Sequence, residues 1–277
     1  MREDGTSGAS DSEAIILAQM QDRPTTYPKA KKGPLPAPDW LVTASDATDR
    51  VVSELKAGKE AEVTLFERTS QQDGRSVLLA AKQLIDINLR DFRKDHEYRE
   101  GRKKADKRQT RALESRSRYG KVVKAFEWAH HEFLTACSLW EAGVPVPYPV
   151  SFDNVEFVME FIGDHDEALA APRLIDVAPQ LSKGELEAIW EQLADAILKM
   201  SGAGVVHADL SAYNVLLWGE IKIIDFPQAV DPTVNSSAVD FLERDIGTLA
   251  VWFRKRGVHV AGRALFNECK TLFQEDE

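Results

Sequence analysis

His-Ala-Asp-Leu-Ser-Ala-Tyr-Asn at residues 207–214 and Ile-Lys-Ile-Ile-Asp-Phe at residues 221–226 are the two stretches that decide the fold. The first has the spacing H-x-D-x-x-x-x-N, and the second is a short apolar strand that ends on an Asp-Phe pair. Short apolar strands flank Gly219, which predicts a hairpin. A tight loop followed by this hairpin brings Asn214 and Asp225 to one face.

The residue types in these stretches suit phosphoryl transfer. That reaction needs a carboxylate to orient the attacking hydroxyl, and Mg²⁺ prefers carboxylate and amide oxygens as ligands. We therefore predict Asp209 and Asp225 as catalytic residues, with Asn214 and Asp225 as the Mg²⁺ ligands. Loop Asp and Asn residues that only make turn hydrogen bonds are the alternative. That alternative would win for a single residue, but the combined pattern favours catalysis.

The upstream half of the chain offers a nucleotide site. A loop at residues 58–63 lies between two predicted strands, where a phosphate-covering loop is expected, although it lacks the three glycines of G-x-G-x-x-G. Lys82 ends an apolar strand, where its ammonium can reach the α- and β-phosphates, and Glu132 on a predicted helix at about 121–142 offers it a partner. The pattern predicts ATP with Mg²⁺, or Mn²⁺, as the bound pair. The loop residues predicted to contact the nucleotide are Gly58, Lys59, Glu60, Ala61 and Val63.

These motifs together resemble the RIO family of atypical serine/threonine protein kinases, over about Leu55 to Arg256. The loop at 58–63 is similar to that family's G-K-E-A-x-V loop, and the stretch at 207–214 is similar to its H-A-D-L-S-x-x-N loop. The other matching positions are Ala81-Lys82 for the strand lysine, 128–132 for W-A-x-x-E, 144–147 for I-P-x-P, 158–163 for the hinge and 224–228 for the metal-binding strand.

The resemblance implies an ATP-dependent kinase or ATPase. It implies that the hinge residues Met159, Glu160 and Ile162 contact adenine, which in that family is bound through backbone groups. It also implies a protein substrate or autophosphorylation, and a role in ribosome maturation. Lys56 and Ala57 stand where the family usually has Ser or Thr, so the charge of Lys56 replaces a hydroxyl contact to phosphate. H-A-D-L-S and D-F-P-Q are typical of different branches, which leaves the subfamily open.

The predicted fold class is α+β, a two-lobed protein-kinase-like fold. We expect an N-lobe at 41–162 and a helical C-lobe at 163–277. Only 52 residues follow Asp225, so we expect a truncated C-lobe without an activation segment. Residues 1–40 are predicted to be disordered or an extended Pro-rich segment, because five of the twelve prolines fall in the stretch from Pro24 to Pro38.

Charge is distributed unevenly along the chain. The net charge is −10, yet residues 90–124 hold fourteen Lys or Arg and six Asp or Glu, which is +8. This basic segment predicts one local polyanionic partner, structured RNA or a pre-ribosomal particle. A solvated helix face is the alternative. No apolar run of about 18 residues or signal-type N-terminus is present in the sequence, so we expect a cytoplasmic protein without a membrane segment.

Two other functions share parts of this pattern. A small-molecule phosphotransferase of the aminoglycoside or choline kinase type also uses H-x-D-x-x-x-x-N and an Asp-Phe strand, usually with a larger helical C-terminal region. A non-catalytic scaffold that ATP switches between two states would need the nucleotide site but not turnover. A substrate-independent ATPase assay beside a panel of small alcohols and aminoglycosides separates the three.

Overall fold

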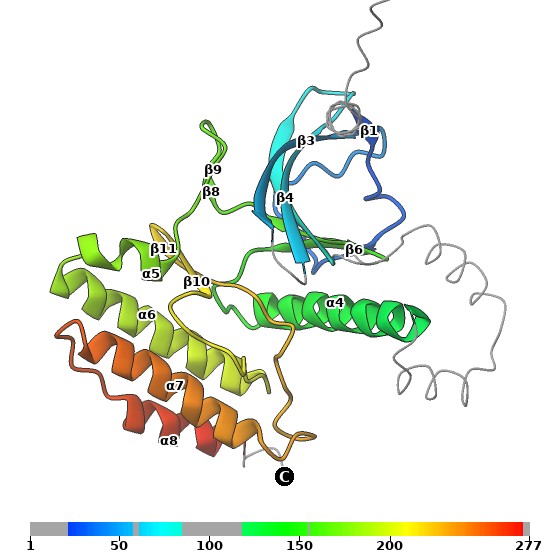
Figure 1. The fold of residues 1–277 in the computed structure, drawn as a ribbon. Coiled ribbons are helices and arrows are strands. Elements are labelled where there is room, and N and C mark those ends of the chain that lie inside the picture. Colours follow the sequence, from blue (N-terminus) through cyan, green and yellow to red (C-terminus); the bar gives the residue numbers. More distant parts are fainter. Residues whose placement is uncertain (1–21, 58–60, 85–117, 155, 274–277) are drawn as a thin grey trace, which may run out of the picture.

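The computed structural model describes residues 22–57, 61–84, 118–154 and 156–273. Figure 1 shows an N-lobe built on a curled sheet, a long helix α4 beneath that sheet, and a C-lobe of stacked helices. This arrangement confirms the predicted α+β, two-lobed class. Most of the basic segment, together with Gly58, Lys59 and Glu60, lies outside the described residues.

The N-lobe sheet has seven strands in the order β1-β3-β4-β5-β7-β6-β2, and every pairing is antiparallel. A hairpin at Asp73-Gly74 joins β4 to β5, with Gly74 in the left-handed region at φ 71°. The strands are β1 (Arg23–Pro24), β2 (Lys31–Lys32), β3 (Thr48–Ala57), β4 (Ala61–Thr69), β5 (Ser76–Leu84), β6 (Pro149–Asp153) and β7 (Glu156–Glu160).

For residues 1–40 we predict a disordered or extended Pro-rich segment; the structure describes residues 22–40 of it, which include the short extended strands β1 and β2. In that stretch β1 pairs with β3 and β2 pairs with β6, so the segment adds a strand at each edge of the sheet. Tyr27 is buried in one cluster with Phe66, Leu79 and Tyr148. Burial of these apolar side chains and the added ladder hydrogen bonds offset the entropy of ordering the segment.

Helix α4 (Arg118–Glu141) supports the opposite side of the sheet. Its buried face carries Ala129, Phe133 and Ala136, which pack against Phe152 of β6 and Phe157 of β7. The rings of Phe133 and Phe157 meet edge to face with centroids 5.6 Å apart, a favourable geometry for an aromatic pair. This packing fixes the position of α4 relative to the sheet and therefore the position of Glu132.

The C-lobe centres on α6, which begins with a capping box. Ser182 accepts the Glu185 backbone N–H, and the Glu185 side chain accepts the N–H of Ser182. The buried apolar face of α6 lies in the largest core cluster of the described residues. The C-lobe elements are β8 (Gly163–Asp164), β9 (Leu169–Ala170), α5 (Leu174–Val177), η1 (Ala178–Gln180), α6 (Lys183–Gly202), β10 (Val215–Trp218), β11 (Glu220–Ile223), α7 (Ala238–Arg254) and α8 (Gly262–Leu272).

The connection between β11 and α7 is short. From Phe226 the chain runs through turns to Ala238, where α7 begins. No helix intervenes in this fully described stretch, which agrees with the predicted lack of an activation segment. Across the described ranges, none of the helices has the length and apolar character that crossing a bilayer requires.

Candidate active site

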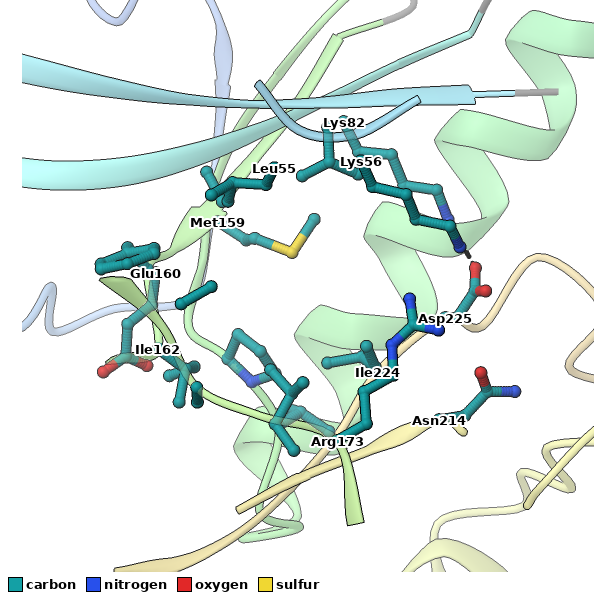
Figure 2. A pocket seen from close by; sticks show the side chains of 18 of the residues that line it. Leu55, Lys56, Lys82, Met159, Glu160, Ile162, Arg173, Asn214, Ile224 and Asp225 are labelled. Carbon is teal, nitrogen blue, oxygen red and sulfur yellow. Dashed lines mark hydrogen bonds and ion pairs between the residues drawn. The ribbon is translucent and has the colours of Figure 1, made fainter. Parts of the chain in front are cut away.

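A cavity of about 380 Å³ lies between the two lobes. Its upper wall comes from β3, β4 and β5, its back from the hinge after β7, and its lower wall from β10 and the residues after β11 (Figure 2). The sequence-predicted residues that line it are Val63, Lys82, Glu132, Met159, Glu160, Ile162, Asn214 and Asp225. Residues more than 160 positions apart in the chain therefore meet at one site.

Lys82 on β5 connects the two lobes. Its Nζ donates to Glu132 Oε1 at 2.6 Å and to Asp225 Oδ1 at 2.7 Å; the second contact is the dashed line in Figure 2. The Lys82 side chain is 15% exposed and that of Glu132 is 6% exposed, so these charges interact with little screening. The predicted clamp between Lys82 and Glu132 is present, and Lys82 also reaches the predicted metal ligand.

The protonation of this triad follows from burial and charge. Burial raises the pKa of the Glu132 carboxyl, and the neighbouring Lys82 ammonium opposes that rise. Burial also favours the neutral form of Asp225, but Lys82 outweighs it and holds the pKa of that carboxyl below its usual range. For Lys82 burial lowers the pKa, and the two carboxylates more than compensate. Asp225 is therefore ionised and ready to hold a cation.

Asp225 has an unusual backbone. Its φ is 77°, a left-handed conformation that side-chain-bearing residues adopt rarely and that clusters at functional sites. The flanking residues hold it there: the Ile224 N–H donates to the Asn214 carbonyl at 3.0 Å, and the Phe226 N–H donates to Glu132 Oε1 at 3.3 Å. The residues on either side of Asp225 are thus bonded to the loop at 207–214 and to α4.

The loop at 207–214 presents two polar side chains differently. Asn214 lines the cavity, and its Nδ2 donates to the Asp209 carbonyl at 2.9 Å, which directs the amide oxygen away from that bond. Asp209 is exposed and is not one of the cavity-lining residues.

The donor set fits Mg²⁺. Asn214 and Asp225 supply amide and carboxylate oxygens in the same cavity, the ligand type that Mg²⁺ prefers. In the part of the chain that the structure describes, no cluster of three His, Cys, Asp or Glu residues is placed to hold a metal. Mg²⁺ commonly takes only one or two carboxylates and completes its shell with water and substrate phosphates, so two protein ligands suffice.

A profile of the RIO domain matches residues 68–265, which is most of the chain and includes Lys82, Glu132, Asn214 and Asp225. The chain belongs to the RIO family. RIO-type serine/threonine-protein kinase Rio1 of Haloferax volcanii is 34% identical over 214 residues, which cover 76% of this chain and 66% of the relative. Rio1 of Thermoplasma acidophilum is 37% identical over 132 residues, covering 47% of this chain and 66% of the relative. The matched region is thus just under two thirds of each of these relatives.

Solved RIO structures show the same fold. The crystal structure of the Rio2 kinase from Chaetomium thermophilum in an ADP/Mg²⁺-phosphoaspartate complex superposes with a TM-score of 0.57 at 20% identity, covering 80% of this chain and 62% of that one. A second Rio2 structure from that organism gives 0.51 at 20% identity, with 79% and 63% coverage. The sequence relatives include proteins named Rio1 and RIO3. These comparisons therefore assign the chain to the RIO family but not to one of its subfamilies.

The hinge of this RIO protein is tied to its neighbours. The Glu160 N–H donates to the Tyr148 carbonyl at 2.9 Å, and the Tyr148 N–H donates to Glu160 Oε2 at 2.9 Å. The Ile162 carbonyl accepts the Ala171 N–H at 2.8 Å. The Glu160 carboxylate is therefore used inside the hinge, and adenine contact by these residues remains a prediction.

Ala61 at the start of β4 does not line the cavity, whereas Lys56 does.

A support for the catalytic loop escaped the sequence analysis. Asp245 of α7 is buried, and the backbone N–H groups of Leu210 and Ala208 lower its pKa, but burial is stronger and raises the pKa to about 6. Arg244 Nη2 donates to the Ala208 carbonyl, and Ala208 has a φ of 63°. Helix α7 therefore holds the strained start of the loop. Asp245 lies in an ordinary helical pattern, so no motif marks it.

Helix α4 is also tied to the loop after Asp225. His131 Nε2 donates to the Ala229 carbonyl at 2.9 Å. With the bond from the Phe226 N–H to Glu132, this gives two contacts between adjacent residues of α4 and one loop. These two bonds join α4 directly to the segment that follows Asp225.

Proposed function

We propose that this protein binds ATP with Mg²⁺ in the interlobe cavity and transfers the γ-phosphoryl group to a protein hydroxyl, as a RIO-type serine/threonine kinase. The observation that carries the proposal is the Lys82 ammonium bound to both Glu132 and Asp225 in one cavity with Asn214. Phosphoryl transfer depends on positioning and on charge stabilisation, and this arrangement supplies both. Autophosphorylation and slow ATP hydrolysis are accommodated by the same site.

Each side chain has a separate task in this proposal. Asp225 and Asn214 would hold the metal through their side-chain oxygens, and Mn²⁺, which also accepts oxygen ligands, would substitute. Magnesium, when bound, supplies positive charge to the phosphate oxygens. Lys82, kept in place by Glu132, orients the α- and β-phosphates. Asp209 receives the hydroxyl of the acceptor from solvent and takes its proton.

The partner of the basic segment is a second proposal. Its +8 charge within a −10 chain favours a polyanion, and it lies in sequence between Lys82 and the helix that bears Glu132. Tyr98, Phe92 and Tyr119 are interleaved with the basic residues and could stack on bases. Structured RNA or a pre-ribosomal particle is the partner we propose.

Asp225→Asn tests the catalytic assignment. The substitution removes the ionised metal ligand, so phosphoryl transfer should fall by about a hundredfold or more, while circular dichroism shows an unchanged fold. Asp195→Asn is the matched control, because it makes the same change on an exposed turn of α6 and should leave turnover unaltered. Turnover of Asp225→Asn within about threefold of wild type would sink the assignment.

The assay also separates the remaining functions. ATP hydrolysis without added acceptor, transfer to a generic protein substrate, and transfer to small alcohols and aminoglycosides are measured side by side. Transfer to protein or to the chain itself supports the kinase. Transfer confined to small alcohols identifies a small-molecule phosphotransferase. ATP binding with no turnover on any acceptor identifies an ATP-switched scaffold.

A further inference from the structure

Arg173 lies where the chain passes from the hinge hairpin β8–β9 into the C-lobe. Its backbone forms a bridge with Leu216 of β10, and its carbonyl accepts the Asp176 N–H at 3.0 Å and the Val177 N–H at 3.2 Å. The Cα is therefore anchored to the strand that begins just after Asn214. The half-buried side chain lines the cavity, and Figure 2 shows it pointing inward from the lower wall, on the Asp225 side.

The guanidinium of Arg173 has no hydrogen bond or ion pair with any residue that the structure describes. A guanidinium carries five N–H donors in a planar fork and stays charged at every physiological pH. Partial burial of such a group without a partner is unfavourable. The position therefore suits an anionic ligand that enters the cavity and takes up those donors.

The other two cations that line the cavity are Lys82 and Lys56. Lys82 is neutralised by Glu132 and Asp225, at 2.6 and 2.7 Å. The third cation in the lining is Lys56, on β3 in the upper wall (Figure 2). Within the described ranges, Lys56 and Arg173 are the lining cations without an ion pair, and they approach the cavity from opposite lobes.

We propose that Arg173 binds the phosphate chain of the nucleotide from the C-lobe side, with Lys56 facing it from the N-lobe. This inference rests on the ATP binding proposed above. An arginine fork matches two phosphate oxygens at once, and such charge-assisted pairs are stronger than neutral hydrogen bonds. Arg173 then adds to Lys82 a second contact by which the site distinguishes a phosphorylated nucleotide from a nucleoside. The loop at 58–63 has few glycines for that purpose.

Calorimetric titration of ATP and of adenosine tests the inference. Arg173→Met keeps the aliphatic stem but removes the fork, so ATP affinity should fall about tenfold while adenosine affinity stays unchanged. Arg173→Lys retains the charge and should lose less. Arg254→Met is the matched control, since Arg254 is an exposed arginine of α7 outside the cavity; it lowers the net charge equally and should leave both affinities unchanged.

The ratio of ATP to adenosine affinity decides the outcome within each folded variant, so Arg173→Lys supplies it if Arg173→Met does not fold. An unchanged ratio in the Arg173 variants overturns the inference and leaves the proposed ATP site standing. An equal loss of ATP affinity and adenosine affinity in the Arg173 variants would place the guanidinium on the nucleoside and would also overturn the inference. Wild-type protein that binds neither ligand overturns the proposed function itself.

Discussion

Breaking the pair between Lys82 and Glu132 is the most informative perturbation of the site. Lys82→Met leaves the Glu132 carboxylate buried, with only the Phe226 N–H as donor. Removing one partner of a buried ion pair costs about 3–5 kcal/mol, because the other charge stays uncompensated. Glu132→Leu should cost less, about 1–3 kcal/mol, since Lys82 keeps Asp225 and only the Phe226 N–H is left without its acceptor.

The double substitution Lys82→Met/Glu132→Leu removes both buried charges together. Replacing a buried pair by apolar residues of similar size is often close to neutral. The double variant should therefore lose at least about 2 kcal/mol less than the sum of the single losses in unfolding free energy. Phosphoryl transfer should fall in all three variants, again by less than the product of the single effects, because the two residues act as one clamp.

The pH dependence gives an independent check. Burial raises the pKa of Glu132 and Lys82 opposes it, so loss of Lys82 raises that pKa further. When the pKa of a carboxyl is higher in the folded state than its unfolded value of about 4.3, the free energy of unfolding falls as the pH rises through the folded-state pKa. The cost of Lys82→Met should therefore be smaller at pH 5 than at pH 8.

Urea denaturation at both pH values measures these terms. The matched control is Arg263→Ala/Glu243→Ala, an exposed pair at 2.6 Å on α7 and α8, where each change should stay within about 0.5 kcal/mol. Additivity of the Lys82 and Glu132 effects within about 0.5 kcal/mol, or a cost of Lys82→Met that is the same at pH 5 and pH 8, would refute the reasoning.

Two further predictions concern the helical lobe and the basic segment. Asp245→Asn should raise the free energy of unfolding at pH 7.5 by roughly 1–3 kcal/mol, since burial raises the pKa of that carboxyl to about 6. The gain should fade toward pH 4, where the wild-type group is protonated, and equal gains at both pH values in urea melts would contradict it. Binding to structured RNA should weaken steeply with salt, and removal of five basic residues should flatten that slope while Mg·ATP affinity stays intact. RNA binding that is undetectable at low salt, or unchanged by the replacement, contradicts the proposal. The five replacements by Ala are at Arg102, Lys103, Lys104, Lys107 and Arg108.

The site could be predicted from sequence where chemistry requires particular residues at short spacing. The loop at 207–214 and the strand that ends at Asp225 carry their own signal, and the structure brings Asn214, Asp225, Lys82 and Glu132 together. Lys82 and Glu132 are 50 residues apart, so their pairing was predictable only because the family likeness relates the strand to the helix.

Other features depend on long-range packing and carry no local signal. The pairing of Lys31 with Phe152 joins segments about 120 residues apart, and a Pro-rich composition gives no hint of it. Asp245 looks like any polar residue on an amphipathic helix until α7 is placed under the catalytic loop. Arg173 becomes notable only because the fold places its charge inside the cavity with no partner among the described residues.

The N-terminal segment also affects the tendency of this protein to aggregate. Unpaired strand edges are templates for association with other chains, and proteins protect them with short strands, lysines or prolines. Here the ten residues 23–32 supply a short strand at each edge of the sheet. Arg23 and Pro24 pair with β3, and Lys31 and Lys32 pair with β6. Proteolytic loss of that stretch would expose the edges of β3 and β6 together, so we expect a chain without residues 23–32 to aggregate more readily.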